Sequence, residues 1–145
     1  MPPTWLIYAL LSALAASFVG IFGKLGMANI DSTFATIVRS VIMTLFLIIT
    51  GVTLRLWPNV QTLSAKSMLA ITLSGIAGAV SWLFYFKAIK AGTVAQVAPI
   101  DKLSMPLAVL LAVIILGDRP TGLNWLGIAL IAGGAFLAAL PAPVK

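Results

Sequence analysis

The sequence of 145 residues contains no cysteine, no histidine and only three acidic residues, all of them aspartate. Without cysteine, the chain has neither a disulfide framework nor a thiolate metal site. Without histidine, it lacks the usual pH switch and the commonest metal ligand in proteins. The remaining residues assemble no nucleophile–base set and no metal cluster. We therefore predict that the protein is not an enzyme, with no catalytic residues, no metal site and no cofactor.

Charge of either sign is scarce, since charged residues make up 8% of the chain and hydrophobic residues 61%. A soluble domain carries about 25% charged residues, and the mean hydropathy here is +1.15. This composition predicts an integral membrane protein. The net charge of +6 does not indicate nucleic-acid binding, because the basic residues are scattered singly and form no basic stripe. They are better explained as loop anchors near anionic lipid head groups.

Five apolar segments of about 20 residues each are long enough to cross roughly 30 Å of hydrocarbon as helices. They cover residues 5–23, 34–54, 68–89, 94–117 and 123–140. The alternation with period two that a membrane barrel would require is absent. Asp31 offers an N-cap for the second segment. We therefore predict an all-α membrane protein with a single domain, residues 1–145, of five transmembrane helices.

Basic residues are divided almost equally between the two ends of these segments. Three belong to the side of the N-terminus, namely Arg55, Lys66 and Arg119, and four to the opposite side, namely Lys24, Lys87, Lys90 and Lys145. Because a positive-inside bias is needed to fix orientation, the chain either inserts both ways or is oriented by Arg39 and Lys102, which lie within the segments. Two copies in opposite orientations would rebuild the inverted repeats of many transporters. We therefore predict a homodimer, antiparallel if both orientations occur.

Three charged residues lie inside apolar segments, where charge is costly and usually functional. These are Arg39 in the second segment and the neighbours Asp101 and Lys102 in the fourth. Beyond Arg39 and beyond Lys102, 15 uncharged residues follow, which cover only about 22 Å as helix. Either the helices extend past these charges, or the side chains snorkel to the membrane boundary. Apolar residues precede both positions, and we favour placement within the membrane.

Lys87, near the end of the third segment, lies at a similar depth to Arg39 and Asp101. An Arg39–Asp101 or Lys87–Asp101 pair would lower the cost of desolvation. Asp101 and Lys102 are about 100° apart around a helix, so they cannot both point straight at one site. Two interpretations stay open. The charges form a pair that only holds helices together, or they form a polar site with excess positive charge for an anionic or zwitterionic solute.

Two prolines flank these charges in the fourth segment. Pro99 and Pro106 each remove a helical hydrogen bond, and broken helices at membrane depth commonly line transport sites. They are predicted hinges, although inert kinks are an equal alternative. Further candidate lining residues of a solute site are Gln96, Ser104, Trp82 and Tyr85. The two aromatic residues are one turn apart and either stack on a solute or only pack.

Glycines on the fifth segment permit close helix contact and suit a dimer face. They are Gly127, Gly133 and Gly134, on a segment that carries no charge. Ser74 and Gly78 form a small-residue face on the third segment, which we assign to packing within the chain.

Four stretches of the sequence resemble those of a known family. They begin at Ser81 (SWLFYFKAI), Val97 (VAPIDKLS), Ile115 (ILGDRPT) and Trp125 (WLGI). Together they resemble a single EamA domain, the half-length five-helix branch of the drug/metabolite transporter superfamily in bacteria and archaea. The resemblance implies efflux or exchange of small organic molecules, and longer relatives are built as two inverted five-helix halves.

The same resemblance implies similarity to four-helix small multidrug transporters, which work as antiparallel dimers. The spacing of Gly127 and Gly134 is similar to the glycine pattern of their dimer helix. Those transporters couple to protons through a Glu in the first helix, and this chain has no Glu. Their mechanism for cationic drugs is therefore not carried over.

These features lead to two functional hypotheses. The first is a secondary transporter of small organic metabolites, in a prokaryotic plasma membrane, that works as a homodimer by alternating access. No ATP-binding motif is present to power it directly. The second is a scaffold or accessory subunit without transport activity, in which the buried charges only hold helices together.

Overall fold

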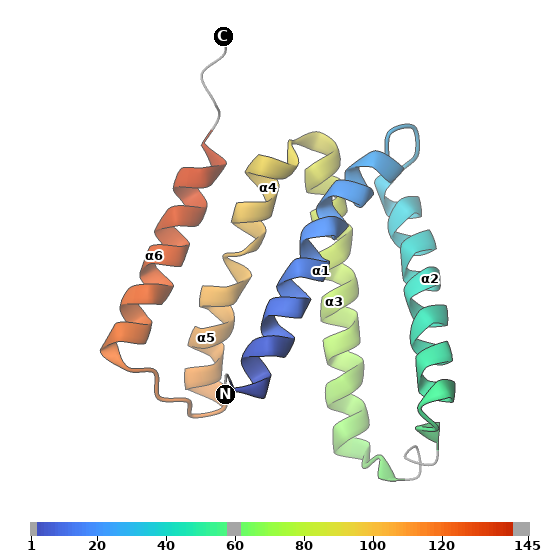
Figure 1. The fold of residues 1–145 in the computed structure, drawn as a ribbon, viewed down its shortest axis with the longest axis horizontal. Coiled ribbons are helices and arrows are strands. Elements are labelled where there is room, and N and C mark those ends of the chain that lie inside the picture. Colours follow the sequence, from blue (N-terminus) through green and yellow to red (C-terminus); the bar gives the residue numbers. More distant parts are fainter. Residues whose placement is uncertain (1–2, 58–61, 141–145) are drawn as a thin grey trace. The chain divides into compact units, whose positions relative to one another are not determined.

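The computed structural model describes residues 3–57 and 62–140, and these contain helices and no strand (Figure 1). The helices are α1 (Thr4–Gly26), α2 (Ser32–Thr53), α3 (Ala65–Ala91), α4 (Val94–Asp101), α5 (Ser104–Ile115) and α6 (Gly122–Ala139). Counted with α4 and α5 as one span, five helical segments are long and apolar enough to cross a membrane. The predicted all-α class with five such helices is therefore confirmed. Lys145, which was counted above, lies outside the described residues.

The chain divides into two compact units. The terminal unit comprises the described residues 3–21 and 91–140, and the central unit comprises residues 22–90. α1 contributes to both, because its last turn belongs to the central unit. The expectation of a single domain stays a prediction.

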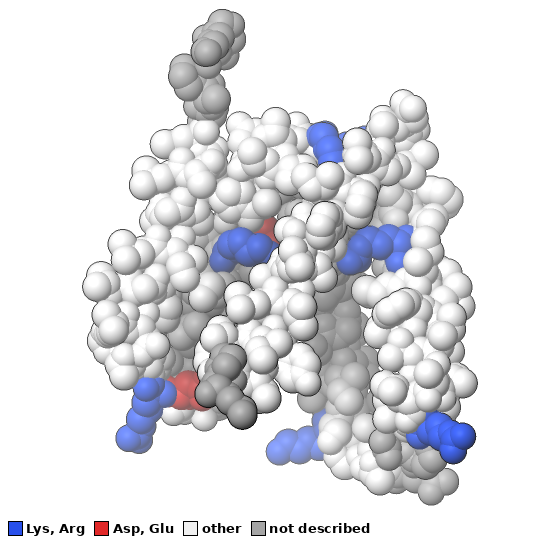
Figure 2. Space-filling view, viewed as in Figure 1, with Lys and Arg blue, Asp and Glu red and all other residues white. Residues whose placement is uncertain are grey.

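Most of the outward surface is apolar, as expected for a chain surrounded by lipid. Large hydrophobic side chains on every helix are exposed, for example Leu11, Phe46, Leu69, Leu107 and Leu130. In the view of Figure 2, charged side chains are isolated patches on an otherwise uncharged surface. This distribution would be unstable in water and suits a bilayer.

In the central unit, α2 and α3 run antiparallel, side by side (Figure 1). The core is small and lies toward the end of α3, where Met27, Phe86 and Ile89 are buried together with Ser32 and Thr36. The last turn of α1 approaches α3 closely, since a Cβ at Gly23 would lie 3.1 Å from Cζ of Phe86. A larger residue at this position would separate the two helices.

Two lysines stabilise this end of the central unit by hydrogen bonds to backbone carbonyls. Nζ of Lys24 donates to the carbonyl oxygens of Ile89 (2.5 Å) and Lys90 (3.4 Å). Nζ of Lys90 donates in turn to the carbonyl oxygen of Ile30, in the loop between α1 and α2. A cation at a helix C-terminus satisfies carbonyls that have no helical partner and favours the negative end of the helix dipole. These lysines therefore anchor helix ends, and contact with lipid head groups stays a prediction.

Asp31 caps the start of α2. One carboxylate oxygen accepts hydrogen bonds from the backbone N–H groups of Thr33 (2.8 Å) and Phe34 (3.0 Å). The bond from Phe34, helped by that from Thr33 and by the charge of Lys90, holds the pKa of Asp31 below its ordinary value of 3.8. A lowered folded-state pKa means that the cap contributes stability above pH 3.8. That contribution is lost as the pH falls through the lower folded-state pKa.

We expect Asp31→Asn to weaken the acid sensitivity of the fold, because asparagine also caps a helix but does not titrate. Above about pH 5 the substitution should change the melting temperature by only about 1–2 °C. Between pH 4 and pH 2.5 the unaltered protein should lose more stability than Asp31→Asn. Melting curves in detergent across this range measure the difference, and parallel losses in both proteins would contradict the assignment.

In the terminal unit, α6 lies along α4 and makes fewer contacts with α5. Both α4 and α6 begin with a capping box, formed by Thr93 with Gln96 and by Thr121 with Asn124. α5 ends before Gly117, whose φ of 77° is a left-handed conformation that glycine adopts without strain. These signals fix where each helix begins and ends.

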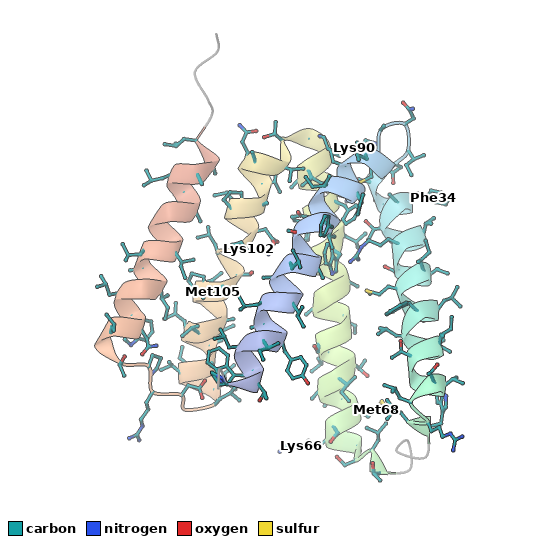
Figure 3. All side chains as sticks on the ribbon, in the orientation of Figure 1. Phe34, Lys66, Met68, Lys90, Lys102 and Met105 are labelled. Atoms are coloured by element: carbon teal, nitrogen blue, oxygen red, sulfur yellow. The ribbon has the colours of Figure 1, made fainter. Side chains whose placement is uncertain are left out.

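The fourth membrane segment, predicted over residues 94–117 with hinges at Pro99 and Pro106, is broken into two helices. α4 ends at Asp101 and α5 begins at Ser104, with Lys102 and Leu103 between them. Pro106 explains the break, because it has no N–H for the carbonyl of Lys102 and its ring would clash with that carbonyl in a regular helix. The N–H of Met105 bonds to the Lys102 carbonyl instead, at 3.0 Å. Figure 3 labels Lys102 and Met105 at this break.

Candidate functional site

Arg39 is the charged residue of α2 that lies within its apolar span. The Cζ atom of its guanidinium lies 3.8 Å from the centroid of the Trp82 ring on α3, and 5.8 Å from that of Phe86. Both distances are within the range of cation–π attraction. The Nη1 atom of Arg39 is buried, and among the described residues it has no hydrogen-bond partner. The guanidinium is therefore held against an aromatic surface while part of its donor capacity is unsatisfied.

The aromatic surface is a cluster of Trp82, Tyr85 and Phe86 with edge-to-face contacts. The ring centroids are 5.5 Å apart for Trp82 and Tyr85, 5.8 Å for Trp82 and Phe86, and 6.0 Å for Tyr85 and Phe86. Edge-to-face contacts are a favoured geometry for aromatic pairs. Both predicted lining residues thus pack within the chain, and contact of Trp82 or Tyr85 with a solute stays a prediction.

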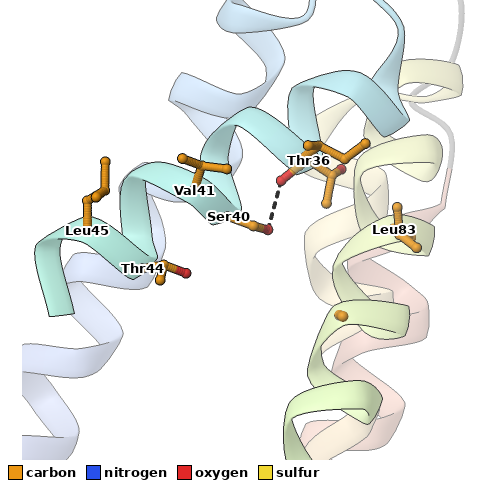
Figure 4. Close-up of a pocket in the computed structure, with 8 residues that line it drawn as sticks. Thr36, Ser40, Val41, Thr44, Leu45 and Leu83 are labelled. Atoms are coloured by element: carbon orange, nitrogen blue, oxygen red, sulfur yellow. Dashed lines mark hydrogen bonds between the residues drawn. The ribbon is translucent and has the colours of Figure 1, made fainter. Parts of the chain in front are cut away.

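A groove lies between α2 and α3, and its lining on α2 includes residues on both sides of Arg39 in the sequence (Figure 4). It has a volume of about 410 Å³, and it is lined by Thr36, Ile37, Ser40, Val41, Thr44, Leu45, Ala79 and Leu83. The Thr36 hydroxyl donates to the Ser32 carbonyl and the Ser40 hydroxyl to the Thr36 carbonyl, both at 2.8 Å. Their lone pairs stay available, so the groove offers hydrogen-bond acceptors in apolar surroundings.

Sequence reasoning missed this hydroxyl stripe. Thr36, Ser40 and Thr44 recur every four residues, which places them on one face of α2. The spacing was visible in the sequence, but it does not say which neighbouring helix the stripe faces.

Asp101 and Lys102 form a local ion pair at the break between α4 and α5. Nζ of Lys102 lies 3.5 Å from a carboxylate oxygen of Asp101, and the two side chains are 64% and 32% exposed. Lys102 is the C-cap residue of α4, so the 100° separation of neighbours on a regular helix does not keep the two groups apart. A carboxylate and an ammonium group that are partly exposed at a helix break can bind polar solutes or ions.

The predicted meeting of Asp101 with Arg39 or Lys87 stays a prediction. Arg39 and Lys87 belong to the central unit, and Asp101 and Lys102 belong to the terminal unit. Within the central unit, Lys87 is exposed and follows Trp82 by five residues, or about 140° around α3. The structure therefore does not bring Lys87 to the aromatic face that holds Arg39.

The remaining predicted residues have defined places. Gln96 is engaged in the capping box of α4, where its side-chain oxygen accepts from the N–H of Thr93 at 3.3 Å. Ser104 is the first residue of α5, Pro99 lies inside α4, and Pro106 is buried in the first turn of α5. Ser104 and Pro106 thus lie next to the break between α4 and α5, whereas Gln96 caps the start of α4.

The predicted dimer glycines are open to contact. A Cβ at Gly127, Gly133 or Gly134 would meet nothing within 4 Å. Gly127 also borders a groove of about 670 Å³ between α5, the loop at Asp118 and α6. These glycines are therefore not used to pack helices within the chain, and their role in a dimer stays a prediction.

Comparison with known proteins places the chain in a family. Residues 3–140 match the EamA-like transporter family. The chain is 39% identical over 140 residues to a protein of Sinorhizobium sp. named "Uncharacterized transporter in cobO 3'region", a match that covers 97% of this chain and 99% of that protein. No solved structure matches the chain. The resemblance inferred from the four sequence stretches is confirmed, and the chain belongs to the EamA-like transporter family, as a multi-pass membrane transporter of small solutes.

Proposed function

We propose that the protein is a secondary transporter that exports or exchanges small organic metabolites. The observation that carries this proposal is the break at Lys102 and Leu103, in the middle of a span over residues 94–115, beside the Asp101–Lys102 ion pair. Interrupted helices at membrane depth commonly form the solute and ion sites of transporters, because unwound backbone supplies polar groups there. The Asp101–Lys102 pair supplies one charge of each sign at this point.

In the central unit, Arg39 and Lys87 add two positive charges. Positive charge is therefore in excess among the candidate residues, and the proposed solute is anionic or zwitterionic. Trp82 and Tyr85 of the central unit and Ser104 of the terminal unit are further proposed solute contacts, and Gln96 supports the start of α4. Pro99 and Pro106 act as hinges. The scaffold hypothesis requires the buried charges to join different helices. Asp101 instead pairs with Lys102, its immediate neighbour in the chain. This local pairing supports transport over scaffolding.

The working unit that we propose is an antiparallel homodimer. Five spans are one half of the inverted pairs found in many transporters, and near-equal charge on the two sides of the chain permits both orientations. Gly127, Gly133 and Gly134 have open space above them for a partner helix. Alternating access then arises from rocking of the two copies in a prokaryotic plasma membrane, a location that fits the bacterial relative.

We expect Asp101→Asn and Lys102→Ala each to slow solute export about tenfold or more, because a lost charged hydrogen bond costs roughly 1.5–3 kcal/mol. Proteoliposomes loaded with an isotope-labelled bacterial metabolite extract would be followed by mass spectrometry of the released solutes. Lys66→Gln is the matched control, since it removes an exposed positive charge at the start of α3. Release no faster than from liposomes without protein would refute transport, and unchanged release in both variants would refute the role of the break.

A further inference from the structure

We propose that Arg39, stacked on Trp82, binds the carboxylate of the transported solute, and that this solute is a monocarboxylate with an apolar body. The inference rests on the proposed transport function and adds the chemical class of the solute. It starts from the contact of 3.8 Å between the guanidinium and the indole ring and from the buried, unpartnered Nη1 atom.

The guanidinium of Arg39 contacts the indole ring at 3.8 Å, while its buried Nη1 atom has no hydrogen-bond partner among the described residues. A guanidinium that stacks on an aromatic ring keeps its N–H donors in its own plane, where they point outward. Two parallel N–H donors match the two oxygens of a carboxylate. Trp82 therefore holds Arg39 in an orientation suited to bidentate binding of one planar anion.

The unpartnered Nη1 atom calls for an acceptor, because buried donors in proteins are almost always hydrogen-bonded. The carboxylates that the structure describes have other contacts or lie elsewhere. Asp31 accepts from the start of α2, and Asp101 pairs with Lys102. Asp118 lies outside the apolar spans, in the loop between α5 and α6. An acceptor oxygen on the solute could bond to Nη1 of Arg39 while Asp31 and Asp101 keep the contacts described here.

The surroundings of Arg39 favour one carboxylate rather than two. Lys24 and Lys90 donate to backbone carbonyls, and Lys87 lies about 140° around α3 from Trp82. Arg55 follows Arg39 by 16 residues and Lys66 precedes Trp82 by 16 residues, each about 24 Å along a helix. Helix geometry therefore places Lys87, Arg55 and Lys66 away from the contact between Arg39 and Trp82.

The rest of the site favours an apolar solute body. The rings of Trp82 and Phe86 lie beside Arg39, and Tyr85 contacts Trp82. Trp82 and Tyr85 are only half-buried. Aromatic surface next to a fixed cation suits a ring or a short aliphatic chain that carries one acidic group. The structure thus points to aromatic or aliphatic monocarboxylates, with inorganic phosphate and dicarboxylates as poorer ligands.

Three probes of the same shape test this inference on the full chain in lipid nanodiscs. They are phenylacetate, its neutral isostere phenylacetamide, and the cation phenethylamine. Dissociation constants follow from the dependence of the melting temperature on ligand concentration. We expect phenylacetate to bind at least about tenfold more tightly than either of the others. Equal affinity for the amide, tighter binding of the amine, or no binding of any probe would overturn the inference.

Variants of Arg39 test the residue itself. Arg39→Gln should weaken phenylacetate binding about tenfold or more, and Arg39→Lys should weaken it less, because lysine keeps the charge but not the fork. Lys66→Gln should leave the affinity unchanged. If Arg39→Gln does not fold, Arg39→Lys and the comparison of acid with amide on the unaltered protein still decide the result. Phenylacetate affinity that is unaffected by Arg39→Lys and Arg39→Gln would overturn the inference.

Transport and binding can fail separately in these experiments. Binding of phenylacetate that depends on Arg39, without any counterflow of it in proteoliposomes, would refute the proposed transport function and leave the carboxylate site in place. Counterflow of another solute that is insensitive to Arg39→Lys would refute the carboxylate site and leave transport in place.

Discussion

Phe86→Ala is expected to lower the free energy of unfolding by about 3–5 kcal/mol, the usual cost of truncating a buried phenylalanine. Phe86 is only 2% exposed, and its ring contacts Trp82 and Tyr85. The ring of Phe86 also packs closely against Gly23 of α1. A Cβ atom added at Gly23 would lie 3.1 Å from the Cζ atom of Phe86. Its removal leaves a cavity where α1 and α3 meet, and surrounding helices fill such a cavity only in part.

The matched control is Phe84→Ala, which truncates the same residue type two positions earlier on α3. Phe84 is 67% exposed and faces outward, so we expect a loss of less than about 1 kcal/mol. Unfolding of both variants in mixed micelles with increasing dodecyl sulfate measures the difference. Equal losses would mean that the buried cluster around Phe86 does not stabilise the central unit.

Pro106→Ala is expected to stabilise the protein while slowing transport about tenfold, a barrier increase of about 1.4 kcal/mol. Alanine restores an N–H that can bond to the Lys102 carbonyl, which allows α4 and α5 to join as one helix. One or two added backbone hydrogen bonds contribute about 1–3 kcal/mol in all. The distortion beside Asp101, where the Met105 N–H bonds to the Lys102 carbonyl, is then lost. With it goes the proposed arrangement of the Asp101–Lys102 pair for a solute.

Pro99→Ala separates this effect from that of losing a proline in general. Pro99 lies inside α4, which continues past it to Asp101, so its replacement should stabilise the helix and leave the break in place. Hydrogen exchange of the Lys102 and Leu103 amides reports whether the break has closed, and export assays report the rate. A closed break with an undiminished rate in Pro106→Ala would show that the break is an inert kink.

The number and type of the membrane helices could be predicted from the sequence, because the length of an apolar run decides whether it spans hydrocarbon. The cap at Asp31 was predictable for a similar reason, since capping is a local interaction. Pro106 marked the fourth span as irregular. The position of the break followed only from the hydrogen bonds, because Pro106 shows which carbonyl loses its partner but not how the neighbours rearrange.

The contacts of the candidate site were less accessible to sequence reasoning. Arg39 and Trp82 are 43 positions apart in the chain, and their stacking depends on how α2 and α3 are rotated about their axes. Charge pairing was the simpler expectation for Arg39, yet an aromatic ring also stabilises a cation away from water. Likewise, Lys24 and Lys90 were predicted to anchor at lipid head groups, whereas carbonyls at helix ends compete for the same amines.

The bond from Lys24 to the carbonyl of Ile89 has a consequence for biosynthesis. The two residues are 65 positions apart, and a ribosome adds about 5–20 residues per second. The end of α1 therefore waits roughly 3–13 s for its acceptor to be synthesised. During that time the first two spans lack the contacts with α3. The bonds from Lys24 to Ile89 and from Lys90 to Ile30 can form only after the end of α3 has been synthesised.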